Sequence, residues 1–212
     1  LIYFFKYDIG GAGWNANYVL FNTFGGGIQI ISMMLFYPLF RKFISAMQVF
    51  YVSFVMAIGG YAVLLALMFT NHTNIYILMI PGFFIFTAFG MLTVLTTVFL
   101  ANTVDYGELK NNRRDESVIF SMQTFVVKLA SGVAAMIASI CLTISNISND
   151  TSTEAAAMVS DSYTSVAVLR MTMTVLPIIG LLVAVFIFAK KYILTDEKLG
   201  EINQELAHRH KA

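Results

Sequence analysis

Charged residues are scarce in this sequence. Only 12% of its 212 residues are Asp, Glu, Lys or Arg, whereas a soluble globular domain carries about 25%. The formal net charge is +1, which gives no sign of a nucleic-acid partner. There is one cysteine, Cys141, so no disulfide can form within the chain. The composition therefore excludes an ordinary soluble domain.

The residue groupings that catalysis and nucleotide use require are also missing. No cluster of His, Cys and carboxylates has the spacing of metal ligands. His72, His208 and His210 have no catalytic partner nearby in the sequence, and no phosphate-binding loop occurs. We therefore expect neither an enzyme nor ATP-driven transport, and no metal and no cofactor.

Apolar residues make up 58% of the chain and occur in long blocks. A helix needs about 20 apolar residues to cross a bilayer. Residues 1–5 also read as the end of a further helix, so we take the chain to be a fragment of an all-α integral membrane protein. The predicted spans are 16–40, 43–69, 75–102, 117–142 and 166–189.

Basic residues are distributed unevenly over the connections. Successive connections between spans lie on opposite sides of the membrane. The connections on one side contain a single basic residue, Lys6. Because cytoplasmic loops are rich in Lys and Arg, the opposite set and the carboxy terminus are predicted to be cytoplasmic. The protein would then be a multi-pass membrane protein with a cytoplasmic carboxy terminus. The residues of this set are Arg41, Lys42, Lys110, Arg113, Arg114, Lys190, Lys191, Lys198, Arg209 and Lys211.

The segment from Asn102 to Gly132 carries the most informative motifs. It contains Asp-Tyr-Gly-Glu at 105–108, mixed charges at 110–116 and Ser-Met-Gln-Thr-Phe-Val-Val-Lys at 121–128. This pattern resembles the glycoside–pentoside–hexuronide:cation symporters. The resemblance implies a major-facilitator fold built from two six-helix bundles. Residues 1–192 would form the carboxy-terminal bundle, with the end of helix 7 and helices 8–12, and residues 193–212 a cytoplasmic amphipathic tail.

The resemblance also implies a function. It predicts secondary active uptake of a glycoside, pentoside or other sugar by alternating access, coupled to H⁺ or Na⁺. The partners would be the sugar, the coupling cation, the lipid bilayer and the missing amino-terminal half, where the cation site is expected. Two alternatives stay open, namely a facilitator or exchanger without obligate coupling and a membrane receptor or enzyme that does not transport.

Lys128 is the first candidate for the substrate path. It lies near the middle of its predicted span, where an ionised side chain costs about 2.5–3.5 kcal/mol and usually faces the bundle interior or a water-filled path. Ser121, Thr124 and Ser131 share its helical face, which offers donors and acceptors to sugar hydroxyls. The alternative is an ion pair that only holds helices together. The resemblance places Gln123, Thr124, Val127 and Lys128 at the sugar site.

The preceding span offers a second stripe at helical spacing. Gly82, Phe86, Gly90, Thr93 and Thr97 recur along it. Small residues more often indicate close helix packing, so packing is the leading interpretation of this stripe. Thr93 and Thr97 remain candidates for the pocket.

Three charged residues are candidates for a cytoplasmic gate. Asp105, Arg113 and Arg114 lie in the mixed-charge segment, and pairs at the inner rim can close that side during alternating access. We expect their partners in the missing half. The alternative is a solvated loop whose ion pairs contribute little. One further basic residue, Arg170, is near a span end and is expected to extend its side chain outward to water.

Overall fold

The computed structural model describes residues 2–9, 13–70, 74–144, 163–194 and 196–209, and within these ranges all regular structure is helical. The chain starts with a short helix α1 (Ile2–Phe4) that continues as a π-helix η1 (Phe5–Ile9). Helix α2 (Trp14–Ile31), π-helix η2 (Ser32–Phe36) and α3 (Tyr37–Phe43) follow. Together these three form the first long rod, Trp14–Phe43.

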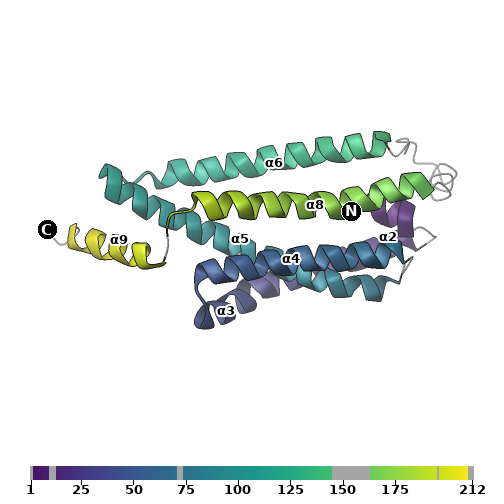
Figure 1. Ribbon diagram of the computed structural model, residues 1–212, viewed down its shortest axis with the longest axis horizontal. Coiled ribbons are helices and arrows are strands. Elements are labelled where there is room, and N and C mark those ends of the chain that lie inside the picture. Colours follow the sequence, from purple (N-terminus) through teal and green to yellow (C-terminus); the bar gives the residue numbers. More distant parts are fainter. Residues whose placement is uncertain (1, 10–12, 71–73, 145–162, 195, 210–212) are drawn as a thin grey trace.

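Four more rods and a tail helix complete the described part of the chain. The rods are α4 (Ala46–Phe69), α5 (Ile75–Asn111), α6 (Glu116–Ile144) and α8 (Tyr163–Lys191). The tail helix is α9 (Asp196–Arg209). The rods run alongside one another, and α9 lies at one end beside the last turns of α5 (Figure 1). Five helices are long and apolar enough to cross a membrane, as the sequence predicted.

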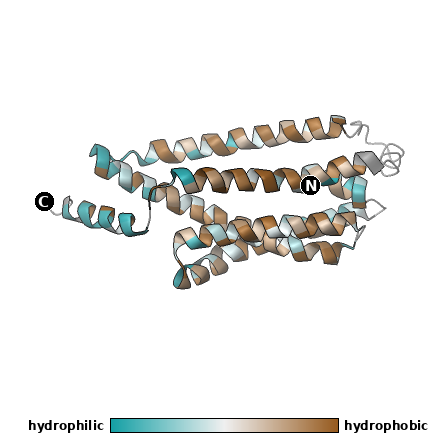
Figure 2. Ribbon diagram, in the orientation of Figure 1, coloured by the Kyte–Doolittle hydropathy of each residue, from teal (hydrophilic) through white to brown (hydrophobic). Residues whose placement is uncertain are grey.

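The two ends of the rods differ in polarity. We call the end nearest α9 the basic end, because α3, α5 and α8 finish there with Arg41, Lys42, Lys110, Lys190 and Lys191. The opposite end, where α1 and η1 lie, is called the distal end. Hydrophilic residues gather in α9 and at the basic end, while the middle of the rods is apolar (Figure 2). The predicted basic residue Lys211 lies outside the described residues, as does the side chain of Arg209.

Local interactions set the start of α4 and the end of α5. Ser45 accepts a hydrogen bond from the backbone of Gln48, and the Gln48 side chain accepts one from the Ser45 backbone, so both unpaired amides are satisfied at the start of α4. Helix α5 ends at Asn112, whose φ is 51°. Asparagine is one of the few residues that adopt this left-handed conformation readily. The turn into α6 can therefore be short.

Glycines let α2, η2 and α5 approach closely. A Cβ atom at Gly90 would lie 2.6 Å from Ser32 Cβ and 2.7 Å from the backbone oxygen of Gln29. At the same crossing, the buried Ser32 hydroxyl donates to the Thr87 carbonyl at 2.6 Å. A Cβ atom at Gly82 would meet Phe21 at 3.0 Å. Close packing is therefore the correct interpretation of the glycines in the α5 stripe.

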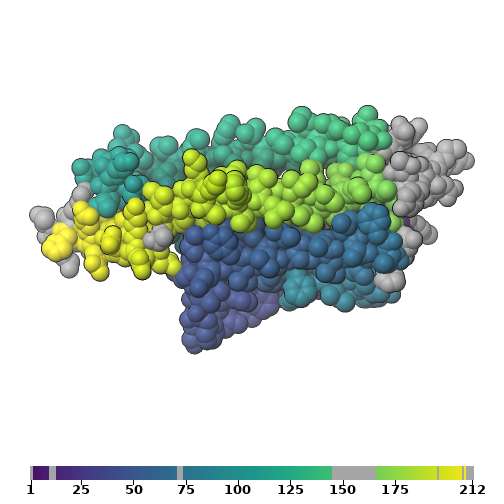
Figure 3. Space-filling view, in the orientation of Figure 1, coloured from purple at the N-terminus to yellow at the C-terminus, as the bar shows by residue number. Residues whose placement is uncertain are grey.

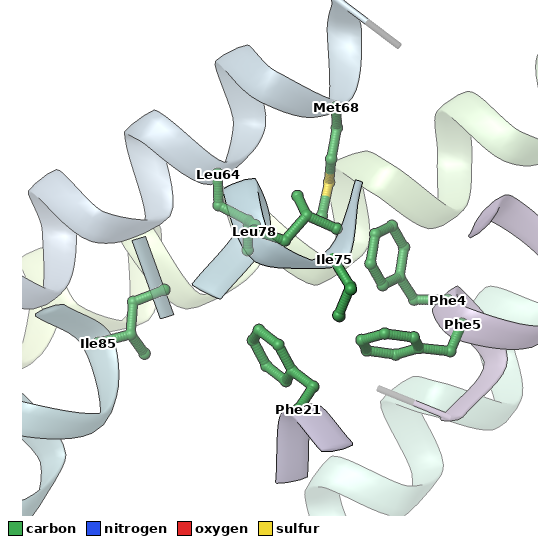
Figure 4. Packing of buried hydrophobic residues seen from close by; sticks show 8 residues of the cluster. All are labelled: Phe4, Phe5, Phe21, Leu64, Met68, Ile75, Leu78 and Ile85. Atoms are coloured by element: carbon green, nitrogen blue, oxygen red, sulfur yellow. The ribbon is translucent and has the colours of Figure 1, made fainter. Parts of the chain in front are cut away.

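Apolar clusters join the rods at both ends. At the distal end, side chains from α1, η1, α2, α4 and α5 converge around Phe5 and Phe21, whose ring centroids are 5.4 Å apart (Figure 4). At the basic end, the Phe188 ring of α8 stacks on Phe50 of α4 at 4.1 Å and on Tyr192 at 4.5 Å. These contacts hold α8 against the α4–α5 pair.

The tail helix packs by its apolar face. Ile202 and Leu206 are buried together with Leu194 against Tyr106 and Leu109 of α5. Arg41 at the end of α3 pairs with Asp196 at 3.8 Å. Figure 3 shows α9 seated beside the end of the bundle where α5 and α6 join. The amphipathic tail predicted from the sequence therefore rests on the helix ends.

Candidate functional site

Most side chains of helix α6 are exposed. Only Cys141 and Leu142, near its distal end, are buried. Lys128 lies near the middle of this helix and is exposed. It makes no ion pair with any residue in the described ranges. Its place on a substrate path, and any partner on another helix, therefore stay predictions.

The position of Lys128 along the helix still constrains its surroundings. An ammonium group at the middle of a helix of membrane-spanning length costs about 2.5–3.5 kcal/mol when it faces lipid. Its face of α6 is not covered by any described segment. Such a face is suited to contact another protein segment or a water-filled path.

Three hydroxyl groups share the Lys128 face and have similar geometry. Ser121, Thr124 and Ser131 each donate to a carbonyl of their own helix, at 2.9, 3.1 and 3.0 Å. Because each proton is used within the helix, the hydroxyl oxygens present lone pairs outward as acceptors. Lys128 has three N–H donors and no acceptor. The face therefore combines acceptors with a strong cationic donor.

The remaining predicted path residues differ in burial. Val127 is exposed beside Lys128, and Gln123 is half-buried. Thr93 and Thr97 are exposed on α5. The Thr93 hydroxyl donates to the Phe89 carbonyl at 2.8 Å, and the Thr97 hydroxyl donates to the Thr93 carbonyl at 3.3 Å. Within the described ranges, no hydrogen bond joins the α5 threonines to the polar face of α6. The structure thus groups the α6 residues on one helix and leaves Thr93 and Thr97 on another.

The predicted gate residues form a compact network at the basic end. Arg114 Nη1 lies 2.8 Å from Glu108 and 3.2 Å from Asp105, and its Nε lies 3.2 Å from Glu116. Hydrogen bonds to Glu108 and then to Glu116 raise the pKa of Arg114 above its ordinary value. Its guanidinium therefore stays charged at every physiological pH. Arg113 pairs separately with Asp115 at 2.6 Å.

Two features of this network differ from the expectation. Asp105 and Glu108 lie on the last turns of α5, which continues to Asn111, and not in a loop. Arg114 also finds carboxylate partners within the described residues, so its charge does not depend on a partner elsewhere. Further partners there stay a prediction.

The structure corrects the prediction for Arg170. Its side chain is only 11% exposed, and it donates from Nε and Nη2 to Asp8, with a closest distance of 2.7 Å. Asp8 lies in η1, 162 residues away, and its side chain is 4% exposed. The side chain therefore points into the protein and not outward to water. Nothing in the local sequence around either residue indicates this pairing.

One large cavity lies between α2, α4, α5, α6 and α8, with a volume of about 460 Å³. Its wall is almost entirely apolar, and Tyr3, Tyr61 and Thr172 are lining residues with hydroxyl groups. None of the predicted path residues lines it. A sugar needs several placed polar groups, so this cavity does not have the lining of a sugar site.

No group of three or more His, Cys, Asp or Glu side chains that could hold a metal ion occurs in the described part of the chain. The polar face of α6 and the charge network at the basic end therefore make up the candidate site.

Comparison with known proteins gives the same class. A family model described as MFS/sugar transport protein matches residues 1–196. The chain belongs to this family. The resemblance to the glycoside–pentoside–hexuronide type of transporter is thereby confirmed, together with an all-α major-facilitator-type fold. The family is one of transport proteins and not of enzymes, as the sequence predicted.

Curated relatives agree with this assignment. A lactose permease from Lactobacillus delbrueckii subsp. bulgaricus is 32% identical over 97% of this chain and 31% of its own length. A raffinose carrier protein from Pediococcus pentosaceus is 28% identical over 97% of the chain and 30% of its own length. An uncharacterized symporter, YjmB, from Bacillus subtilis is 24% identical over 97% of the chain and 41% of its own length. The chain thus spans about a third of the length of these relatives.

Proposed function

We propose that the full-length protein is a secondary active transporter that takes up a glycoside, pentoside or other sugar together with H⁺ or Na⁺. The observation that carries this proposal is the polar face of α6. Lys128 lies there in mid-span without a described ion-pair partner, flanked by the outward-facing hydroxyl oxygens of Thr124 and Ser131. The lactose, raffinose and symporter names of the relatives support a sugar cargo.

The roles of the side chains follow from their chemistry. The Lys128 ammonium would donate to sugar hydroxyl oxygens, and the oxygens of Ser121, Thr124 and Ser131 would accept from sugar hydroxyl protons. Gln123 can do both, while Val127 offers an apolar contact. Transporters of this kind bind substrate near the bilayer midplane, between their two halves. The rest of the protein would cover this face, contribute its own contacts and hold the coupling cation.

The network of Asp105, Glu108, Arg114 and Glu116 would act at the cytoplasmic rim. Arg114 and Asp105 are 51% and 30% exposed, so this ion pair can separate into water at little cost. Pairs of this kind can open and re-form as the two bundles rock against each other. The basic end, with α9, would therefore be cytoplasmic, in the plasma membrane of a bacterium.

The test is sugar-evoked movement of H⁺ or Na⁺ in liposomes that contain the full-length protein, across a panel of α- and β-linked glycosides. Lys128→Ala should lower uptake at least 10-fold, because a single charged hydrogen bond contributes about 1.5–3 kcal/mol. Lys190→Ala is the matched control. Lys190 is a lysine at the end of α8 and stacks over Phe186, so its removal should leave uptake unchanged.

The possible outcomes separate the remaining classes. Sugar entry without cation movement would show a facilitator or exchanger. Sugar binding without entry would show a receptor. Wild-type uptake by Lys128→Ala would remove the polar face of α6 from the substrate path.

A further inference from the structure

The Asp8–Arg170 pair is the most buried ion pair in the described part of the chain. The two Arg170 nitrogens contact both carboxylate oxygens of Asp8, with distances of 2.7, 2.9 and 3.1 Å. Arginine is suited to this contact because its planar fork matches a carboxylate. The pair connects η1 to α8 at the distal end of the bundle.

An apolar cluster adjoins the pair along the chain. Tyr7 and Leu169, which precede Asp8 and Arg170 in sequence, are buried together with Cys141 and Leu142 of α6. The pair thus lies where η1, α6 and α8 meet. Separating its members would leave the Asp8 carboxylate, whose side chain is only 4% exposed, without Arg170, which is costly for a buried charge.

The other side of this short segment is attached to α2. The Phe5 ring lies 5.4 Å from Phe21 and 5.9 Å from Tyr18. Segment η1 therefore contacts α2 through Phe5 and α8 through Asp8. A π-helix places side chains differently from an α-helix and often occurs at functional sites.

The exposure of the two charge networks is the basis for assigning them different roles. Arg114 at the basic end is half exposed, whereas the Asp8 side chain is 4% exposed. The Arg114–Asp105 contact, whose side chains are 51% and 30% exposed, therefore exchanges with water more readily than the Asp8–Arg170 contact. Only the first has the properties of a gate.

We propose that Asp8 and Arg170 are positioning residues whose ion pair stays closed throughout transport, so that η1 and the distal part of α8 move as one body. This inference depends on the proposed transport function and adds a constraint to it. Opening of the distal end must then occur at another boundary of the bundle.

The experiment replaces the ion pair by a reversible covalent link. Asp8→Cys and Arg170→Cys are combined in the full-length protein without other cysteines, including Cys141→Ala, and treated with a reducible bifunctional thiosulfonate. Without the reagent, the maximal rate of sugar uptake should fall while the apparent KM stays unchanged. The link should restore the rate, and reduction should lower it again.

Two results would overturn the proposal. One is a block of uptake by the link that reduction relieves, since the pair would then have to open in each cycle. The other is parental uptake by the double cysteine variant before any reagent is added. Cys141→Ala without the two new cysteines is the control for reagent effects.

A second set of variants addresses failure to fold. Asp8→Arg and Arg170→Asp should each lower the maximal rate, and their combination should recover it, because the pair is re-formed with reversed charges. Arg170→Lys should recover only part, since it cannot make the two-nitrogen contact. A combination no better than either single change would contradict a positioning role.

A third measurement does not require transport. Spin labels at Lys6→Cys and Ala167→Cys, beside the intact pair, report the distance between η1 and α8. One distance distribution, unchanged by lactose, raffinose, Na⁺ or pH, is expected. A second distance on any of these additions would overturn the proposal. If the unmodified protein transports no sugar, the proposed function fails, while this distance still tests the pair.

Discussion

Single residues decide how closely the helices can pack and where charge can be placed. Lys128 and Arg170 both lie within helices of spanning length, yet one is exposed and the other is held by a buried carboxylate. Gly90 brings η2 within hydrogen-bonding distance of α5. A substitution that adds or removes one small group at such a position is therefore expected to change how two helices pack.

The first prediction at this scale concerns Gly90. Gly90→Ala should lower the thermal stability of the purified protein, by about 1–3 kcal/mol in free energy of unfolding, because the new methyl would overlap Ser32 and the Gln29 carbonyl. Gly26→Ala is the matched control, since a Cβ atom there meets nothing within 4 Å. Circular dichroism melting in detergent measures both. Equal melting temperatures would show that η2 moves aside.

Whole elements were predictable to different degrees. The five spans could be predicted because long apolar runs are a strong signal. The end of α5 could not be predicted, since hydropathy falls after residue 102 while the helix continues through Gly107 to Asn111. Hydropathy indicates where lipid ends, and backbone conformation determines where a helix ends. The Asp8–Arg170 pair was missed because it depends on the fold and not on neighbouring sequence.

The second prediction concerns α9 as an element. Ile202→Glu should release α9 from α5, because it places a charge among Leu194, Leu206 and Tyr106. Hydrogen exchange of residues 196–209 should then rise at least 10-fold. Gln204→Glu, at an exposed position of the same helix, should leave exchange unchanged. Protection that persists in Ile202→Glu would mean that α9 is held mainly by the Arg41–Asp196 pair.

At the scale of the whole molecule, the two ends of the described bundle and one of its sides differ in charge and cover. One end carries α9 and the basic residues in the last turns of α3, α5 and α8. The other end carries the buried Asp8–Arg170 pair. The polar face of α6 lies between them without cover from the described segments. This distribution fits a body that is closed at its distal end and open along one side to the rest of the protein.

The third prediction concerns the orientation of the molecule. In a protein without other cysteines, Lys198→Cys should react with a membrane-impermeant thiol reagent only in inverted membrane vesicles, and Gly13→Cys only in right-side-out vesicles. The basis is the excess of basic residues at the end of the bundle with α9. The reverse pattern would place that end outside the cell, and the Arg114 network would then lie at the outer rim.

The length of α5 has a mechanical consequence. Its 37 residues make a rod of about 55 Å, which exceeds the hydrocarbon core of about 30 Å. A tilt of about 10° around its midpoint would move its end by roughly 5 Å, about the pitch of one helical turn. Asp105, Glu108 and the α9 contacts lie on this protruding arm. The helix is thus a lever that can convert a small rocking motion within the membrane into a displacement large enough to break or make an ion pair at the surface.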